Sequence, residues 1–456
     1  MKKFYILLFL ALFLFQIPCP AKHVQNTDDT IKYLNMEWWQ NYNDENLCDN
    51  LLLVYKSNYD LKNAALKVRE NEQIVKMQFA NELPQIGLSA DLNRDLRAPM
   101  QQFGNMSIPK YSQYNYYIPI SASYEVDIWG TNRLKTKSEK ERLEIIKQAQ
   151  RATYIALSCD FAADYFNLIK ADELIKIQDE LIKIQEETVL KIKDKYETGL
   201  CSVNELLEEE RVLTRLKEEK NLHIKTRDML IDTMRVYLSN SEADIKRSDY
   251  SNLKIVENLP LEYQSDIISN RPDYIQEEAN IKRVGFDVRV AKREFLPKFV
   301  IFGQIGLNAY HLGTLFNSAS QLFNAGILPS FDIFSGGRKL ALLRLRKYEY
   351  EEALNSYQKT ALQGIKEVNS ALVDYKQNLK NYDESLERLK LQNKTFELVN
   401  DKREIGAASD LDVLYAKTAY LIVQKEEVSN KINTLLSIIG LYRASGGVDL
   451  CNYENI

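Results

Sequence analysis

The sequence predicts an α+β membrane protein made from an internally duplicated chain, in which a few strands are attached to very long helices. The duplication is visible as three motif pairs that recur at offsets of 205, 207 and 213 residues. These pairs are D-I-W-G-T-N-R (127–133) with D-I-F-S-G-G-R (332–338), D-K-Y-E-T-G-L-C-S (194–202) with D-K-R-E-I-G-A-A-S (401–409), and Leu83-Pro84 with Leu296-Pro297. Alternating segments and heptad-spaced segments then predict the strands and the helices of each copy.

The predicted segments follow this duplication along the chain. They are the signal peptide 1–21, the N-terminal segment and first helix 22–82, the first strand pair 83–129, the first helical hairpin 130–240, a connector 241–270, the first helix of the second copy 271–295, the second strand pair 296–334, the second hairpin 335–443 and a C-terminal tail 444–456. Each copy therefore contains a first helix, a strand pair and a helical hairpin.

The N-terminus has the pattern of a secretory signal peptide. Two lysines precede an apolar run over residues 4–17, and small residues follow. Two readings of its processing stay open: cleavage after Ala21, or acylation of Cys19, although Pro18 stands where a lipoprotein signal has a small residue. Beyond residue 21 no apolar run is long enough to cross a bilayer as a helix, but alternating transmembrane strands escape this criterion.

Composition argues against several classes of function. The net charge is −4, and the basic residues are dispersed among as many carboxylates, so no nucleic-acid partner is expected. The cysteines lack C-x-x-C spacing, so neither a disulfide framework nor a metal site is predicted, and Cys159 is expected to be a small core residue. With three histidines, none near a Ser or Cys motif, and no phosphate-binding glycine loop, we predict no enzyme and no cofactor.

Two strands are expected after each Leu-Pro pair, because apolar residues alternate there with polar or small ones. Each strand is about ten residues long, the length that a tilted strand needs to cross a bilayer. The members of one strand that are expected to face lipid are Ile118, Ile120, Ala122, Tyr124 and Val126.

Helices account for most of each copy. The first helices are expected at about 46–80 and 271–295, and the long helices at about 134–197 and 340–404. Within the first long helix, L-I-K-I-Q-D-E is followed directly by L-I-K-I-Q-E-E, and such seven-residue spacing is typical of helices packed as a coiled coil. Shorter antiparallel helices, at about 203–238 and 410–441, complete the hairpins.

The hairpin turns are the first candidate functional region. In each turn a glycine suited to the left-handed conformation is followed three residues later by a capping serine and then by a carboxylate at the third helical position. The tip candidates are Gly199, Asn204, Glu205, Arg403, Gly406 and Asp412. Two readings of Glu205 and Asp412 stay open: a cation-attracting mouth, if several chains place them around one axis, or ordinary helix caps.

The passages from strand to long helix are the second candidate region. Its residues are Asp127, Gly130, Arg133, Asp332, Gly336, Gly337 and Arg338. Ion pairs between the aspartates and the arginines are one reading. The favoured reading is structural, with each aspartate ending a strand and the glycines permitting a bend.

Four strands cannot close a barrel, and open sheet edges are not tolerated in lipid, so several chains must pool their strands if these lie in a membrane. The long helices have polar surfaces and would form a wall with water on both sides. A pooled barrel continued by a helical tube would be a conduit.

These motifs resemble the TolC-like outer-membrane efflux proteins over nearly the whole mature chain. The likeness rests on E-W-W (37–39), N-D-E-N-L (43–47), N-Y-D-L (58–61), Y-E-V-D-I-W-G (124–130), R-P-D-Y-I-Q-E-E-A (271–279), P-S-F-D-I-F-S-G-G-R (329–338) and I-G-A-A-S-D-L-D-V-L (405–414). The double tryptophan and R-P-D resemble the branch that works with resistance-nodulation-division pumps.

The resemblance implies a homotrimer in the bacterial outer membrane. Four strands per chain would form one twelve-stranded transmembrane β-barrel, continued by a long antiparallel α-helical coiled-coil tunnel into the periplasm. The implied partners are outer-membrane lipid, a periplasmic adaptor (membrane fusion protein) and an inner-membrane resistance-nodulation-division pump. The expected function is the exit channel of a tripartite efflux system, a passive conduit for small molecules such as drugs or other toxic compounds.

Some family members carry an arginine at the second tip that ties the gate shut. Ala408 stands at that position here, and Arg403, one turn earlier, is the candidate substitute. Two other functions remain as alternatives: a periplasmic coiled-coil adaptor or assembly protein, and the exit duct of a protein secretion system. An adaptor would show one hairpin between β-domains, whereas this chain shows two hairpins, each preceded by a strand pair.

Overall fold

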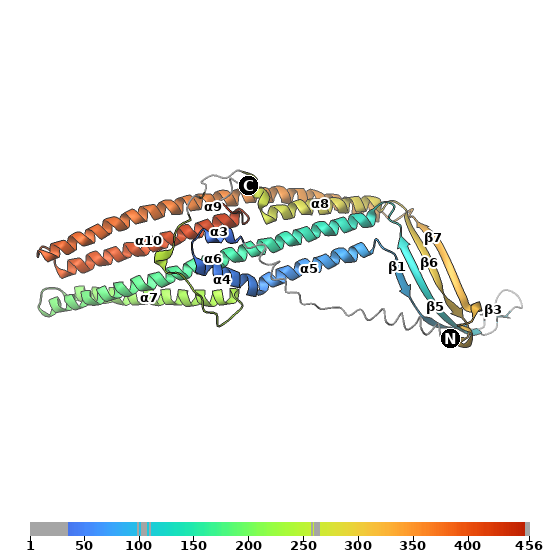
Figure 1. The fold of residues 1–456 in the computed structure, drawn as a ribbon, viewed down its shortest axis with the longest axis horizontal. Helices are drawn as coiled ribbons and strands as arrows, with labels where there is room; N and C mark the ends of the chain where they lie inside the picture. The colour runs from blue at the N-terminus through green and yellow to red at the C-terminus, as the bar shows by residue number, and fades with distance from the viewer. Residues whose placement is uncertain are drawn as a thin grey trace.

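The computed structural model describes residues 35–97, 100–101, 107–108, 111–256, 259 and 265–451. They form an elongated body of long helices with a sheet at one end (Figure 1). Among these residues, no helix is both long enough and apolar enough to cross a bilayer. The predicted signal peptide, with Cys19, lies outside the described residues.

Both copies contain a long helix of the same length, 67 residues, followed by a returning helix of 35 residues. The helices of the first copy are α3 (Met36–Gln40), α4 (Glu45–Ser57), α5 (Tyr59–Ala80), α6 (Thr131–Glu197) and α7 (Val203–Tyr237). Those of the second are α8 (Pro272–Arg293), α9 (Arg338–Glu404) and α10 (Asp410–Ala444). Short 3-10 turns lie at Tyr250–Asn252, Ser265–Asn270, Leu312–Thr314 and Ser318–Ser320.

The single helix expected over about 46–80 is wrong, because the chain breaks it between α4 and α5. Asn58 has an extended ψ of 131°, and its side-chain oxygen accepts hydrogen bonds from the backbone of Asp60 (2.8 Å) and Leu61 (3.1 Å). Asn58 therefore begins a new helix instead of continuing the old one. The first helix of the second copy, α8, has 22 residues and the same length as α5.

The sheet is antiparallel throughout. Its strands are β1 (Gln85–Leu88), β2 (Asp91–Arg97), β5 (Tyr111–Glu125), β6 (Lys298–Ala309) and β7 (Gln321–Ser330). Both β1 and β2 pair with β5, so they act as one interrupted edge strand in the order β1/β2-β5-β6-β7. The small strands β3 (Met100–Gln101) and β4 (Ser107–Ile108) pair only with each other. The structure thus has four main strand positions, two from each copy.

The register places the apolar side chains of all four strand positions on one face, since directly opposed residues share a face. For example, Leu88 opposes Ile120, Ile120 opposes Ile305, and Ile305 opposes Phe323. We call this the apolar sheet face. By register it holds Ile86, Leu88, Leu92, Arg94, Leu96, Ser112, Tyr114, Tyr116, Ile118, Ile120, Ala122, Tyr124, Phe299, Ile301, Gly303, Ile305, Leu307, Ala309, Gln321, Phe323, Ala325, Ile327 and Pro329.

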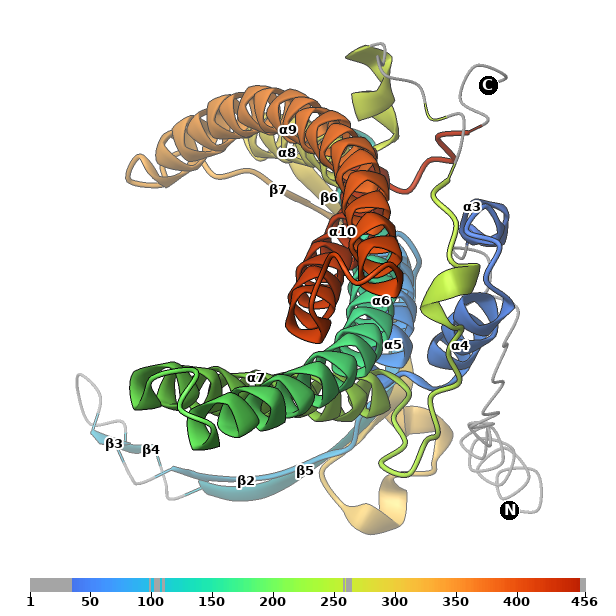
Figure 2. The same ribbon diagram turned by 90° about the vertical axis from the view of Figure 1, so that its left-hand side faces the viewer.

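Viewed along their axes, the long helices form an arc with α9 at one end and α7 at the other (Figure 2). Within the arc α6 packs against both α7 and α10, while α10 also packs against α9. The helices α3 and α4 lie on the convex side of this arc (Figure 2). There Trp38 and Trp39 are fully buried, and the Trp38 ring stacks on Tyr442 of α10 with centroids 4.9 Å apart. The main core is therefore at mid-length, where the N-terminal helices cover the bundle.

Each copy has a joint at which two shorter helices meet end to end, α7 with α5 in the first copy and α10 with α8 in the second. In the first copy the Asn58 amide donates to the carbonyl of Tyr237 (2.9 Å), the last residue of α7. In the second copy the Arg271 guanidinium donates to the carbonyl of Ala444 (2.7 Å), the last residue of α10. Arg271 is buried and also pairs with Asp273 and Glu367.

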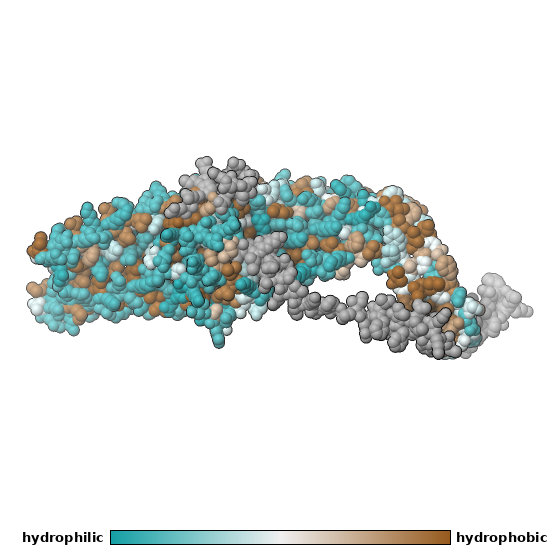
Figure 3. All heavy atoms as spheres, viewed as in Figure 1, coloured by the Kyte–Doolittle hydropathy of each residue, from teal (hydrophilic) through white to brown (hydrophobic). Residues whose placement is uncertain are grey.

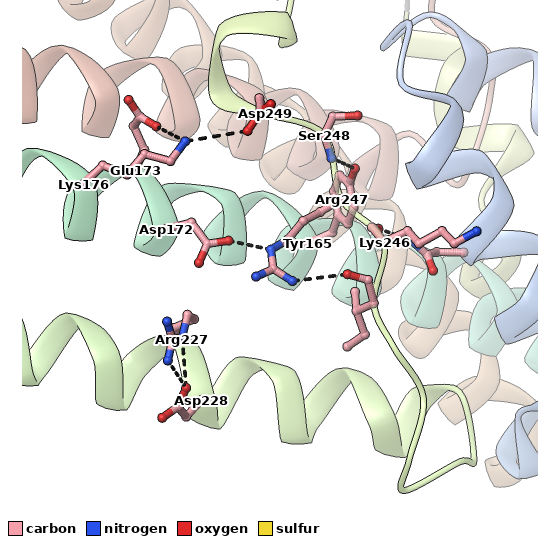
Figure 4. Close-up of polar contacts among 12 residues, drawn as sticks. Tyr165, Asp172, Glu173, Lys176, Arg227, Asp228, Lys246, Arg247, Ser248 and Asp249 are labelled. Atoms are coloured by element: carbon pink, nitrogen blue, oxygen red, sulfur yellow. Dashed lines mark hydrogen bonds and ion pairs between the residues drawn. The ribbon is translucent and has the colours of Figure 1, made fainter.

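The connector after α7 is fastened to α6 by charged contacts (Figure 4). Arg247 pairs with Asp172 of α6 at 2.5 Å, and the backbone N–H of Ser248 donates to the Tyr165 hydroxyl at 3.1 Å. Further along, Tyr250 donates to the buried carboxylate of Glu427 on α10 at 2.9 Å. These contacts hold the connector against both α6 and α10.

Candidate functional site

Both hairpin turns have the backbone that the sequence predicts. Gly199 (φ +76°) and Gly406 (φ +75°) are in the left-handed region, where a residue with a Cβ costs roughly 1–2 kcal/mol. Ser202 and Ser409 then begin α7 and α10, each with a complete capping box whose third-position partner is Glu205 or Asp412.

The two carboxylates therefore do act as helix caps, as one of the two readings expected. Asp412 accepts from the Ser409 backbone at 2.7 Å, and hydrogen bonds from the Ser409 side chain and backbone lower the pKa of this carboxyl. Asn204, the second residue of α7, is exposed. The tip candidates thus lie together at the end of the helical body farthest from the sheet (Figure 1).

An ion-pair cluster at this end joins the two hairpins. Asp410, the first residue of α10, pairs with Lys191 of α6 at 2.7 Å and with Arg403 of α9 at 2.5 Å. We call these three residues the tip tie. Hydrogen bonds from Lys191, and then from Arg403, lower the pKa of the Asp410 carboxyl. Arg403 thus contacts the carboxylate of Asp410 in its own hairpin, and its role as a substitute for an arginine lock stays a prediction.

A second link between the two hairpins lies farther from the turns than the tip tie. The Tyr415 hydroxyl of α10 donates to Glu209 of α7 at 2.9 Å, and the same carboxylate accepts from Gln185 of α6 at 2.6 Å. Burial, and then the hydrogen bond to Glu209, raises the pKa of Tyr415 to about 12. Sequence reasoning missed Lys191, Glu209, Asp410 and Tyr415. No local pattern marks them, because single polar residues on helix surfaces acquire partners only when the hairpins pack.

The two passages from strand to helix are built differently. In the first, Asp127 accepts from the backbone N–H groups of Asn132 (3.2 Å) and Arg133 (3.0 Å), and it also pairs with the Arg133 side chain at 3.4 Å. Burial alone would raise the pKa of Asp127, but the backbone hydrogen bonds from Arg133 and Asn132 outweigh it and lower the pKa. Asp127 is therefore both a helix cap and an ion-pair partner.

In the second passage the ion pair between Asp332 and Arg338, the less favoured of the two readings, is not observed. Asp332 pairs with Lys339 at 3.2 Å, while Arg338 begins α9. The glycines have the expected freedom, since Gly130, Gly336 and Gly337 all have positive φ values of 68°, 59° and 80°. Lys339, the actual partner, was missed because it is one position beyond the repeated motif.

The strand residues expected to face lipid lie on the apolar sheet face. Ile118, Ile120, Ala122 and Tyr124 belong to it by register, and Val126 follows one residue after the end of β5. Exposed apolar side chains gather on the sheet, whereas the helical body is largely hydrophilic (Figure 3). Ile86, Ile305, Phe323 and Ile327 on this face are all at least 60% exposed. So large an exposed apolar surface indicates contact with lipid or protein.

Comparison with known proteins gives one consistent result. A family model described as outer membrane efflux protein matches residues 53–226 and 264–447. The pyoverdine export outer membrane protein OpmQ of Pseudomonas putida is 24% identical over 91% of this chain and 88% of its own length.

Two solved channels share the fold. The CmeC outer membrane channel of Campylobacter jejuni superposes with a TM-score of 0.81 at 24% identity, over 91% of this chain and 88% of that one. The open state of the MtrE outer membrane channel of Neisseria gonorrhoeae gives 0.79 at 20% identity, over 90% and 91%. Since the family model covers both copies, the chain belongs to the outer membrane efflux protein family, whose members act in the outer membrane.

Proposed function

We propose that this chain is the outer-membrane exit channel of a tripartite efflux system, a passive conduit that carries small molecules from the periplasm to the exterior. The observation that carries the proposal is the division of one elongated molecule into an apolar sheet face and a hydrophilic helical body (Figure 3). The related OpmQ is named for pyoverdine export, which supports small molecules as the cargo. Drugs or other toxic compounds are the cargo class we propose.

We further propose that three chains assemble. Both edges of the sheet, β1/β2 on one side and β7 on the other, lack a partner among the described strands. Because lipid tolerates no open sheet edge, β7 of one chain would pair with β1/β2 of the next. Three chains would give twelve strands in one closed barrel.

The ends of the helical arc support the same assembly. On α7, Leu222, Met229 and Val236 are seven residues apart and more than 60% exposed. On α9, Leu391 and Leu398 have the same spacing and are more than half exposed. Heptad-spaced apolar residues are typical of helix partners in a coiled coil. Since α7 and α9 lie at opposite ends of the arc (Figure 2), α9 of one chain would pack on α7 of its neighbour and close a tunnel.

The tip is the proposed gate. The tip tie holds the two hairpins of one chain together, and six carboxylates from Glu205 and Asp412 of three chains would give a cation-attracting mouth. Leu200 and Ile405, at the two turns, are 76% and 80% exposed and offer an apolar surface to a periplasmic adaptor. We propose that an adaptor and an inner-membrane resistance-nodulation-division pump open this gate.

The molar mass of the purified protein, corrected for bound detergent, tests the assembly. We expect a particle of three chains that precipitates when detergent is removed and that conducts ions in a planar bilayer. A monomer that stays in solution without detergent would refute the channel and favour an adaptor or assembly protein. A two-chain particle would refute the twelve-stranded barrel.

A further inference from the structure

One residue departs from the chemistry of the apolar sheet face. Among the described strand residues that share this face, Arg94 of β2 is the only one with a charge. It opposes Tyr114 of β5 and is exposed. Its neighbours along β2 on the same face are Leu92 and Leu96, which are 65% and 57% exposed. A cation therefore lies within a surface that is otherwise suited to lipid.

The arginine is held in a defined position. Its guanidinium lies over the Tyr114 ring, 5.3 Å from the centroid, and its Nε donates to the Ser112 hydroxyl at 3.4 Å. The ring of Tyr116 is near that of Tyr114, with centroids 6.2 Å apart. A guanidinium stacked on an aromatic ring keeps its edge N–H groups free for an anion in the plane.

Among the residues that the structure describes, Arg94 contacts Tyr114 and Ser112, and no carboxylate pairs with it. The segments 96–124 and 296–331, which hold β6, β7 and all of β5 except its last residue, Glu125, contain neither Asp nor Glu. The two acids closest in sequence, Asp91 and Asp95, fall on the opposite face of β2 because side chains alternate along a strand. In the proposed assembly a neighbouring copy would bring its β7, which also contains no acid, to this edge. The described part of the chain therefore leaves the charge of Arg94 available to an anion from outside the protein.

The position of Arg94 along the sheet indicates which anion it would meet. The row of Arg94 and Tyr114 lies toward the end of the sheet away from the helices, since β5 runs from Tyr111 at that end to Glu125 next to α6. An arginine in hydrocarbon costs several kcal/mol on a lipid-facing strand, and this cost falls toward the interface. Aromatic residues are likewise enriched at that level. With the sheet in the membrane as proposed, Arg94 would lie at the level of the headgroups of the outer leaflet.

We propose that Arg94, braced by Tyr114, binds the phosphate of a lipid headgroup in the outer leaflet. The planar guanidinium fits a phosphate with two parallel hydrogen bonds, which makes the contact selective for phosphate-bearing lipids over neutral ones. Three chains would carry three such sites around the rim of the barrel. This inference rests on the proposed function, because it requires the sheet to lie in the membrane.

The test uses the full-length protein in detergent micelles that contain either phosphatidylglycerol or the neutral digalactosyldiacylglycerol. Native mass spectrometry counts the lipids retained per chain, and the melting temperature is followed in parallel. We expect wild-type protein to retain phosphatidylglycerol preferentially and to melt at a higher temperature with it. Arg94→Gln should weaken phosphatidylglycerol retention about tenfold, as expected for the loss of a charged hydrogen-bonding partner. Arg94→Lys should recover only part of it.

Matched controls separate this site from general charge effects and from misfolding. Arg215→Gln removes the same charge from an exposed position on α7 and should leave lipid retention unchanged. Arg94→Gln should melt like wild type in neutral micelles. Equal retention by wild type and Arg94→Gln would overturn the inference, and so would an equal stabilisation by inorganic phosphate alone. Either result leaves the three-chain mass and the conductance intact, whereas a soluble monomer would instead refute the proposed function.

Discussion

The joint between two shorter helices is held by Asn58 in the first copy and by Arg271 in the second. Asn58 begins α5 and donates to the carbonyl of Tyr237, the last residue of α7. Arg271 begins α8 and donates to the carbonyl of Ala444, the last residue of α10. Asn58 uses one neutral amide, while Arg271 adds ion pairs to Asp273 (2.7 Å) and Glu367 (2.6 Å). The duplicated chain has thus kept the geometry of its joints and changed their chemistry.

The same contrast recurs at the other repeated points. The first passage from strand to helix uses Asp127 as a cap and an ion-pair partner, whereas Asp332 in the second only pairs with Lys339. At the tips, Asp410 of the second copy is tied to the first hairpin, whereas its counterpart in the first copy, Val203, is apolar. Local geometry repeats because it depends on backbone conformation. Charged contacts differ because each copy has different neighbours.

The largest effect is expected at the helix joints. Arg271→Ala would leave Asp273 and Glu367 without their common cation and would open a cavity beside Gly364. We expect a loss of roughly 2–3 kcal/mol, somewhat below the range for a fully buried pair because both carboxylates are partly solvated. The melting temperature in detergent, followed by the fluorescence of the buried tryptophans, measures it.

The matched variant is Asn58→Ala, which removes a neutral cap and should cost about 1 kcal/mol. The melting temperature should therefore fall more for Arg271→Ala than for Asn58→Ala. Equal decreases would mean that the ion pairs add nothing to the carbonyl contact that the two joints share. In that case the chemical difference between the copies would have no energetic consequence.

A smaller effect is expected at the passages from strand to helix. Asp127→Asn keeps the side-chain shape but removes the charge that faces the first turn of α6, which should cost about 1 kcal/mol. Amide hydrogen exchange in the first turn of α6 should accelerate roughly fivefold. The matched variant, Asp332→Asn, removes an ion pair with the largely buried Lys339 but no cap of the first turn of α9, so exchange there should change less than in α6. Similar acceleration in the first turns of α6 and α9 would contradict the proposed difference between Asp127 and Asp332.

The comparison between copies also shows what could be predicted from the sequence. Gly199, Gly406 and the two serine caps were predictable because turn and cap chemistry depends on neighbours within a few residues. The strands were predictable because alternation marks one face. The break at Asn58 was missed because the apolar spacing continues across it, although asparagine is a favoured cap.

The contacts between hairpins were not predictable. Lys191 and Asp410 are 219 positions apart in the chain, and nothing near either residue indicates the other. Arg403 was singled out only through the resemblance to a family, and its partner was not identified. The repeated sequence motifs thus predict the backbone geometry. The ion pairs between the hairpins cannot be predicted from them, because these pairs depend on how the hairpins pack side by side.

The smallest structural effect, and the one closest to function, is expected at the tip tie. Asp410→Asn removes the charge that holds Lys191 and Arg403, so the two hairpins should separate more readily. We expect conductance in planar bilayers to rise, severalfold at most, because exposed ion pairs are weak. The control is Val203→Asn, which places the same side chain at the corresponding position of the first tip and should leave conductance unchanged. Equal increases in both variants would contradict a specific role of the tie.

The pH dependence sharpens this prediction. Hydrogen bonds from Lys191 and Arg403 lower the pKa of Asp410 in the folded protein, so the tie is fully present above the ordinary carboxyl value of about 3.9 and is lost as the pH falls through the lowered value. Wild-type conductance should therefore gain a further increment only below about pH 4. Glu205 and Asp412 are common to wild type and Asp410→Asn, so their protonation cancels in the comparison. An increment of the same size in Asp410→Asn would assign the acid response to the capping carboxylates and not to the tie between the two copies.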